Sequence, residues 1–188
     1  MFKYFFSKNS ITRWTIYGIP VIIIIGTLMH FAYDLLGRPL FLAFVFPVNE
    51  SVWEHLKMAF WPILFWWIIG YRTLKKKSAP SIYLWFSAAL LSITVTLWLI
   101  VTLYYTYTSA LNIESVVIDI IIFIIAVFIG QFIGLISYRK SSENKLKFFL
   151  ALFILFILLT AFIWFTYNPP KIALFYDFHH QLYGIEKK

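Results

Sequence analysis

Residues 146–167, LKFFLALFILFILLTAFIWFTY, contain one charged side chain, Lys147. A run of about 20 apolar residues is long enough to cross a bilayer as a helix. Similar runs occupy residues 14–33, 55–71, 82–105 and 113–138, and Tyr or Trp stands at nearly every end, as is typical at membrane interfaces. The sequence therefore predicts an all-α fold, a polytopic membrane helix bundle with five transmembrane helices in a single domain over residues 1–188.

The composition of the whole chain agrees with this prediction. Of 188 residues, 62% are hydrophobic and 13% are charged, whereas ordinary globular chains are roughly a quarter charged. A soluble domain of this length has too little interior to hide so much apolar surface, so lipid is the expected solvent for much of it. The chain has no Cys, which excludes a disulfide framework, a thiolate metal site and a thiol nucleophile.

Two shorter apolar stretches do not qualify as spans. Residues 39–48 include Pro47 and are too few to cross a bilayer, so we expect a re-entrant or an interfacial segment. Residues 171–185 follow Asn168-Pro169-Pro170, and we expect them to lie across a membrane face as an amphipathic segment.

The spacing of Gly130 and Gly134 is that of small residues at a helix contact in membranes. Gln131 lies between them, near the end of the fourth predicted span. We therefore interpret this stretch as a site of close helix packing.

The basic residues predict an orientation, because cytoplasmic loops of membrane proteins are enriched in Lys and Arg. One set of connections holds Lys3, Lys8, Arg13, Arg72, Lys75, Lys76, Lys77, Arg139, Lys140, Lys145 and Lys147. The other set holds Arg38, Lys57, Lys171, Lys187 and Lys188. We expect a plasma-membrane protein with a cytoplasmic N-terminus and an extracytoplasmic C-terminus. Its net charge of +8 then reflects orientation in lipid and not nucleic-acid binding.

The predicted outer side holds all four His and every acidic residue except Glu143. His30 and Asp34, at the end of the first span, are four residues apart and share a helix face. Such a pair is typical of a metal ligand, or of a general base with its orienting carboxylate. The alternative is a His that bonds Asp34 or a backbone carbonyl and only closes the helix end.

The densest polar stretch is PVNESVWEHLKM, residues 47–58. In a helix that begins here, Glu50 and Glu54 share one face, and Ser51 and His55 share the adjacent face. Ser51 and Glu54 also have the spacing of a capping box, which is a purely structural role. That role leaves His55 and the second carboxylate unexplained.

Further polar candidates lie in the fourth span and in the tail. Asp119 is about five residues inside its span, and an ionisable group at that depth indicates a functional site, unless it pairs with Arg38, Lys57 or a neighbouring Tyr. The tail LFYDFHHQLYG carries Asp177, His179 and His180. If this tail is helical, Asp177 and His180 share a face. It is then either a lid over the outer site or a solvated amphipathic end.

Together these residues predict a zinc site, because zinc binds three or four His and carboxylate ligands and keeps an open position in enzymes. The expected ligands come from His30, Asp34, His55, Asp119, Asp177, His179 and His180. Glu50 or Glu54 would take a proton from water, and Ser51 would stabilise an oxyanion. No HExxH motif is present.

The function that we expect is a zinc-dependent membrane hydrolase acting on a lipid or lipid-like substrate. Two alternatives remain at this point. One is a binding or transport subunit that captures a small polar ligand between acids and aromatic side chains. The other is a non-catalytic membrane partner protein. Membrane lipids are expected partners in all three cases, and the oligomeric state is open.

The segment PVNESVWEHLKM, followed by AFWPILFW, resembles an uncharacterised family of small bacterial multi-pass membrane proteins, a domain of unknown function. In that family a similar segment follows a first span that ends in His and Asp. The resemblance covers the whole chain and implies a bacterial plasma-membrane protein, but no activity.

The chain is also similar to alkaline ceramidase-like membrane hydrolases, which use a Ser-x-x-x-His pair, an Asp and a later His pair around zinc. The resemblance implies these roles for Ser51 with His55, for Asp119, and for His179 with His180. Those enzymes have seven spans and a later His-x-x-x-His, whereas this chain has five predicted spans and adjacent His residues.

Overall fold

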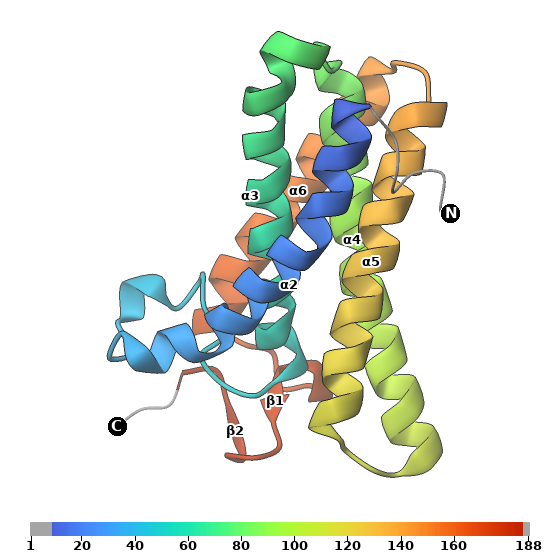
Figure 1. Ribbon diagram of the computed structural model, residues 1–188. Helices are drawn as coiled ribbons and strands as arrows, with labels where there is room; N and C mark the ends of the chain where they lie inside the picture. Colours follow the sequence, from blue (N-terminus) through green and yellow to red (C-terminus); the bar gives the residue numbers. More distant parts are fainter. Residues whose placement is uncertain (1–8, 186–188) are drawn as a thin grey trace.

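The computed structural model describes residues 9–185 and confirms an all-α bundle (Figure 1). Its long helices are α2 Ser10–Leu35, α3 Val52–Ser78, α4 Ile82–Leu111, α5 Val116–Lys140 and α6 Lys145–Tyr167. Short 3-10 turns occupy Leu40–Leu42 (η1) and Ala173–Phe175 (η2), and two short strands occupy Tyr176–Asp177 (β1) and Leu182–Tyr183 (β2). The long helices overlap the five predicted spans.

Short polar side chains set the helix ends. Ser51 and Ser81 cap α3 and α4, and each hydroxyl accepts a hydrogen bond from a backbone amide of the first turn. Such caps satisfy amides that have no partner within the helix. Asn112 adopts a left-handed conformation and ends α4. The next helix, α5, begins at Val116 and not at residue 113 as expected.

By length and composition, α2, α4, α5 and α6 are apolar enough to cross a membrane. The helix α3 is less apolar, because it has charged side chains near both of its ends. It runs alongside the other helices and is largely buried among them (Figure 1). That α3 also crosses the membrane stays a prediction.

The two ends of the bundle differ in charge. At the end with the α3–α4 and α5–α6 connections lie Arg13, Arg72, Lys75, Lys76, Lys77, Arg139, Lys140, Lys145 and Lys147, together with Glu143. The opposite end, with the segment 36–51 and the strands, holds all four His and the remaining described acids. Lys3, Lys8, Glu186, Lys187 and Lys188 lie outside the described residues. Which end faces the cytoplasm stays a prediction.

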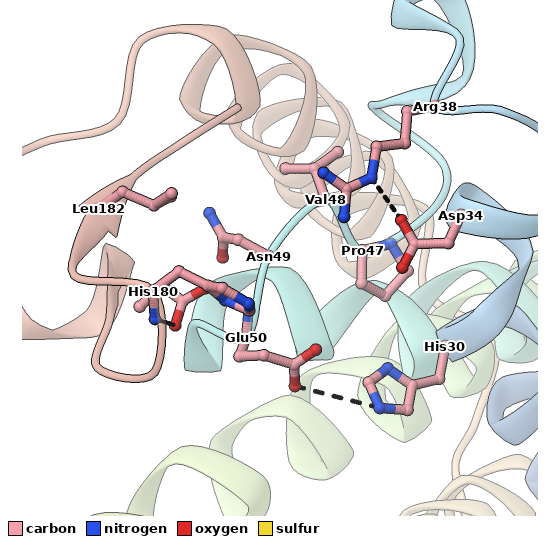
Figure 2. A pocket seen from close by; sticks show the side chains of 10 residues that line it. His30, Asp34, Arg38, Pro47, Val48, Asn49, Glu50, His180 and Leu182 are labelled. Carbon is pink, nitrogen blue, oxygen red and sulfur yellow. Dashed lines mark hydrogen bonds and ion pairs between the residues drawn. The ribbon is translucent and has the colours of Figure 1, made fainter. Parts of the chain in front are cut away.

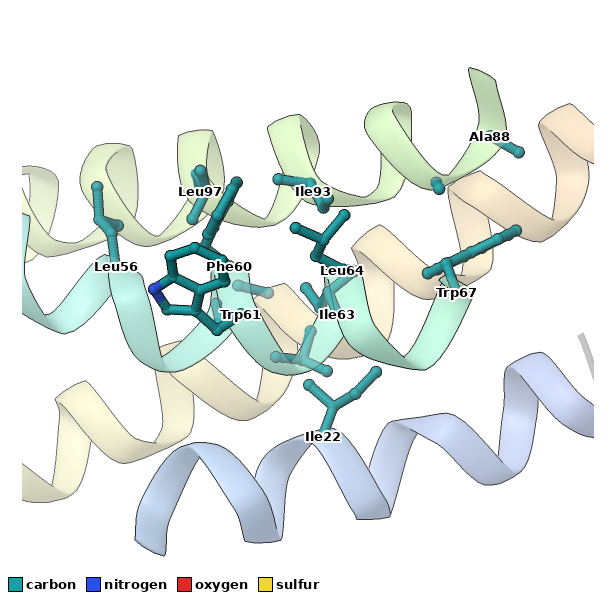
Figure 3. Close-up of a cluster of buried hydrophobic side chains, with 14 of the residues drawn as sticks. Ile22, Leu56, Phe60, Trp61, Ile63, Leu64, Trp67, Ala88, Ile93 and Leu97 are labelled. Carbon is teal, nitrogen blue, oxygen red and sulfur yellow. The ribbon is translucent and has the colours of Figure 1, made fainter. Parts of the chain in front are cut away.

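The core of the bundle surrounds α3. Phe60, Ile63 and Trp67 of α3 are buried against α2 and α4, where Ile22 and Ile93 are also fully buried (Figure 3). Helices in lipid associate through close packing and interhelical hydrogen bonds, because lipid is as apolar as the core side chains.

The predicted packing site at Gly130 and Gly134 is confirmed. A Cβ atom at either position would collide with α4, at Thr96 or at Ser92. Between them, Gln131 donates a hydrogen bond from Nε2 to the Ser92 hydroxyl, 2.9 Å away. The glycines therefore bring α5 against α4 closely enough for this buried polar contact.

A pair of Trp residues fixes the crossing of α2 and α3. The rings of Trp14 and Trp66 stack 4.4 Å apart, and each indole N–H donates to the backbone carbonyl of the other residue. Gly18 lies against the Trp66 ring and Gly70 against the Trp14 ring, where a Cβ atom would collide with the indole. The two glycines make room for this reciprocal contact.

The segment 36–51 folds over the end of α3 that carries the polar stretch. The buried ammonium of Lys57 donates to the backbone carbonyls of Ala43 and Phe46 and to the Glu54 carboxylate. Leu40 and Phe41 point outward and are exposed. Lys57 thus fixes the backbone of segment 36–51 on its buried side, while Leu40 and Phe41 of the same segment remain exposed.

The tail is not the helix that we considered. Instead β1 and β2 form an antiparallel hairpin, with Tyr176 paired to Tyr183 and Asp177 to Leu182. Phe175, directly before the hairpin, is buried against the Trp53 ring at the start of α3. The side-chain amide of Asn49 donates a hydrogen bond to the Gly184 carbonyl, 2.8 Å away. The hairpin therefore lies over the segment that enters α3.

Candidate metal centre

Three side chains from separate parts of the chain meet at one end of the bundle: His30 of α2, Glu50 before α3, and His55 near the start of α3. The Glu50 Oε2 atom lies 3.3 Å from Nε2 of His55 and 4.0 Å from Nε2 of His30. One donor atom from each residue lies within 4.8 Å of the other two. Within residues 9–185, no other three His, Asp or Glu residues form such a set. We call it the His30–Glu50–His55 group.

The contact of Nδ1 of His55 determines whether Nε2 of the same ring donates or accepts a hydrogen bond. Nδ1 lies 2.9 Å from the backbone carbonyl oxygen of Ser51. A carbonyl oxygen only accepts hydrogen bonds, so Nδ1 carries a proton and donates it. In the neutral ring Nε2 is then an acceptor, and it faces a carboxylate oxygen of Glu50 that is also an acceptor. Their close approach requires a proton or a metal cation between them.

The donor set and its spacing suit a metal ion. Two ligands about 2.0–2.1 Å from zinc at a tetrahedral angle are about 3.3 Å apart. The Nε2 to Oε2 separation of His55 and Glu50 matches this value, whereas Nε2 of His30, 4.0 Å from the same Oε2, would have to move closer. Metal-bound His residues usually donate their other N–H to a carbonyl or carboxylate, as His55 does to Ser51.

Glu50 is held by its backbone as well as by its side chain. Its amide N–H donates to Oδ2 of Asp177, 2.9 Å away. The hydrogen bond from the His55 ring is the largest influence on the Glu50 carboxyl and brings its pKa below the ordinary value, although burial opposes this. Glu50 is therefore ionised at neutral pH, in a state in which His55 Nε2 carries the proton that a bound metal would replace.

Asp177 organises the hairpin that covers Glu50. Its fully buried carboxylate accepts hydrogen bonds from the amides of Glu50, His179 and His180, and its Oδ2 lies 2.9 Å from Nδ1 of His180. Burial alone would raise the pKa of this carboxyl, but these hydrogen bonds outweigh burial and lower it. The structure places Asp177 and His180 together, beside the His30–Glu50–His55 group and not within it.

A cavity of about 380 Å³ adjoins the group, and His30, Glu50 and His55 form part of its wall. The remainder is mostly apolar, with Ile100 of α4 and Phe123 of α5 among the lining side chains. Binding sites for small molecules commonly have this size and this mixture of apolar walls with few polar groups. We call this space the apolar chamber.

A second cavity, of about 110 Å³, lies on the other side of Glu50 and His30. Figure 2 shows its lining, in which Arg38 pairs with Asp34 and the Glu50 carboxylate faces His30, with Asn49 and His180 nearby. We call this space the polar chamber. Eight predicted site residues line the two adjoining spaces: Asp34, Asp177 and His180 the polar chamber, His55, Asp119 and His179 the apolar chamber, and His30 and Glu50 both.

Asp34 does not join His30, its predicted partner. Its Oδ1 lies 2.6 Å from Nε of Arg38, and both side chains are exposed. The ion pair joins the last turn of α2 to the residues that end it, since Gly37 and Arg38 both adopt left-handed conformations. His30 is instead near Glu50, which the sequence spacing alone did not relate to it.

Glu54 and Ser51 are buried and line neither chamber. The Glu54 carboxylate accepts hydrogen bonds from Lys57, from the Val48 amide and from the Thr166 hydroxyl. The Ser51 hydroxyl accepts the amide of Glu54 at 3.4 Å, as the capping interpretation predicts. Glu54 does not reach back to Ser51, whose amide instead donates to the Asn49 side chain.

Asp119 and His179 line the apolar chamber but are not part of the His30–Glu50–His55 group. The Asp119 carboxylate accepts a hydrogen bond from the Tyr107 hydroxyl, 2.7 Å away, so the predicted alternative of a neighbouring Tyr is confirmed. The Tyr107 oxygen in turn accepts the Ser115 amide. Asp119 is thereby fixed on a wall that α4 and α5 build.

The comparison with known families supplies one match. A family described as a family of unknown function, DUF6512, matches residues 3–185. The chain belongs to the DUF6512 family. No curated protein and no solved structure matches the chain. The similarity to alkaline ceramidase-like hydrolases therefore gains no support from a relative.

In this DUF6512 protein, sequence reasoning missed Asn49 as a support of the site, and it related Lys57 to Asp119 and not to Glu54. The Asn49 side chain accepts a hydrogen bond from the Ser51 amide at the start of α3 and donates one to the Gly184 carbonyl beside the hairpin. Its place just before a helix cap could have indicated the first of these contacts. The contact with Gly184 joins residues 135 positions apart, and no local pattern encodes it.

Proposed function

We propose that this DUF6512 protein is a zinc-dependent membrane hydrolase that acts on a lipid or lipid-like substrate. One observation carries the proposal: two imidazoles and a carboxylate converge on the wall of a mostly apolar chamber at one end of an apolar helix bundle. The ligand set of two His and one Glu is the set that several zinc hydrolases use, with one position left for water.

The roles of the surrounding residues follow from their contacts. His30, Glu50 and His55 would hold the ion, and the Ser51 carbonyl would orient the His55 ring. When bound, zinc acts as a Lewis acid and lowers the pKa of its water to about 7. Hydrolysis adds the hydroxyl of water to the acyl carbon of an ester or amide, and the remaining proton goes to the leaving oxygen or nitrogen.

Asp119 is our candidate for carrying that proton. It lines the same chamber as the three ligands, and the Tyr107 hydroxyl fixes its carboxylate. A carboxylate outside the ligand set is needed here, because Glu50 is committed to the metal in this proposal. General acid–base groups of this kind contribute about 10²–10⁴-fold to rates.

Elemental analysis of the purified full chain tests the proposal. The protein is prepared without a His tag, supplied with zinc, and dialysed before the metal content is measured. We expect about one zinc per chain in the parent protein, and loss of zinc in His30→Ala and in His55→Ala. His179→Ala is the matched control, because His179 lines the same chamber outside the group and should leave the zinc content unchanged.

Two results would contradict the proposal. One is a parent protein that retains no zinc. The other is equal zinc content in His55→Ala and His179→Ala. A metal-free protein whose His55 forms only an ion pair with Glu50 would instead favour a binding or transport role.

A further inference from the structure

The two chambers share a wall and differ in chemistry. His30 and Glu50 line both of them. The polar chamber is surrounded mainly by charged and amide side chains, including Arg38 and Asn49, whereas the apolar chamber is surrounded mainly by aliphatic and aromatic ones. A molecule that occupies both must therefore have a polar part and an apolar part, joined near the His30–Glu50–His55 group.

Exposed side chains of two apolar helices line the apolar chamber. Phe31 of α2 and Ile120 of α5 line it, and both are more than half exposed although they belong to apolar helices. Figure 1 shows α2 and α5 diverging toward this end of the bundle. Exposed side chains of both helices therefore border the chamber at this end of the bundle.

We infer that the substrate is an amphiphile that enters from the membrane between α2 and α5. Its tail occupies the apolar chamber, its head group occupies the polar chamber, and the bond to be hydrolysed lies between them beside Glu50. The inference rests on the proposed hydrolase function, since the position of the reacting bond is set by the metal ligands.

The sizes of the two chambers restrict the head group more than the tail. The polar chamber, at about 110 Å³, has less than a third of the volume of the apolar chamber, at about 380 Å³. Its lining offers both donors and acceptors, from Arg38, Asn49 and the carboxylates. Glycerol matches this bonding capacity with a compact head group, and a disaccharide provides a larger head group for contrast.

Photo-crosslinking with a glycerol ether tests the inference. The probe is an alkyl glycerol ether that carries a diazirine in its chain, and an ether resists hydrolysis, so labelling does not depend on turnover. The full chain is reconstituted in phosphatidylcholine vesicles, irradiated with the probe and mapped by mass spectrometry. We expect labels concentrated at residues 23–31 of α2 and 116–124 of α5.

Two neighbouring Ile residues of α5 provide a matched pair of variants. Ile120 lines the chamber and is 54% exposed, whereas Ile121 is 48% exposed and does not line it. Ile120→Trp fills the opening and should reduce labelling at α2 and α5 about tenfold. Ile121→Trp adds the same bulk on the surface and should leave labelling unchanged.

The head group is tested with a second probe of the same chain. A maltoside carrying the same diazirine tail should label these residues at least tenfold less than the glycerol ether. Labels spread evenly over lipid-facing residues, including those of α6, or equal effects of the two Trp variants, would overturn the inference.

The inference and the proposed function fail in different ways. Bound zinc together with even labelling would overturn the amphiphile site and leave the metal centre standing. Concentrated labelling in a protein that binds no zinc would overturn the hydrolase and support the amphiphile site. The labelling is therefore repeated on protein treated with a chelator, and the labelled residues are compared with those of the zinc-loaded protein.

Discussion

The buried carboxylate of Asp177 accepts a hydrogen bond from the backbone amide of Glu50, and these two residues are 127 positions apart. The same carboxylate accepts the amides of His179 and His180 in the hairpin turn. One side chain therefore shapes the hairpin and positions the loop that presents Glu50 to His30 and His55.

Replacing Asp177 by Ala should loosen both the hairpin and this loop. Three backbone amides lose their acceptor, and a buried group without a partner costs about 1–3 kcal/mol. We expect the free energy of unfolding in detergent micelles to fall by about 2–3 kcal/mol, and zinc to bind more weakly. Asp177→Asn keeps an acceptor oxygen and should lose less. Equal losses in the two variants would contradict this role.

Ser51→Ala should affect stability and not zinc binding. The hydroxyl caps α3, and removal of a helix cap costs about 1 kcal/mol. The His55 ring bonds the backbone carbonyl of residue 51, which the substitution keeps. Thermal unfolding and metal content are measured on the same sample. Loss of zinc in Ser51→Ala would show that the hydroxyl itself supports the metal ligands.

The buried pair of Glu54 and Lys57 should be costly to break from one side. Lys57→Met leaves an uncompensated carboxylate in the interior, and such a change costs about 3–5 kcal/mol. The double variant Glu54→Gln with Lys57→Met removes the stranded charge and should recover part of the loss. A double variant no more stable than Lys57→Met alone would exclude this explanation.

Gly18→Val should weaken the crossing of α2 and α3. Any side chain at this position meets the Trp66 ring, and overpacking a tight contact costs about 1–3 kcal/mol. Ile24→Val, on the exposed face of the same helix, is the control and should change the unfolding free energy little. Equal effects would mean that the Trp pair tolerates displacement.

Removal of zinc should lower the melting temperature of the parent protein only. A ligand present at about 100 times its dissociation constant stabilises the folded state by about 2.7 kcal/mol. The parent protein and His55→Ala are therefore compared with and without a chelator. Equal shifts in both would place the chelator effect outside the His30–Glu50–His55 group.

The sequence predicted the helices well because their pattern is local. Runs of apolar residues bounded by Tyr and Trp locate spans from neighbouring positions alone, and the cap at Ser51 needs only the residues of one turn. The tail was harder. Its spacing is compatible with a helix, but tertiary contacts of Phe175 with Trp53 and of Asn49 with Gly184 accompany a hairpin.

The site was predicted only in part, for the same reason. His30, Glu50 and His55 were all candidates, but i to i+4 spacing paired His30 with Asp34. The approach of His30 to Glu50 depends on how segment 36–51 folds back, and Lys57 fixes that fold through the carbonyls of Ala43 and Phe46. The pairing of Lys57 with Glu54 was missed, although the two are three residues apart.

The anchoring of Glu50 by Asp177 has a consequence for how the protein is made. All five long helices precede the hairpin in the chain, so Asp177 is made after every long helix of the bundle. The loop that presents Glu50 to His30 and His55 is therefore completed only when the tail folds onto it. A chain that stops before residue 177 would keep the five long helices and lack the acceptor for the Glu50 amide.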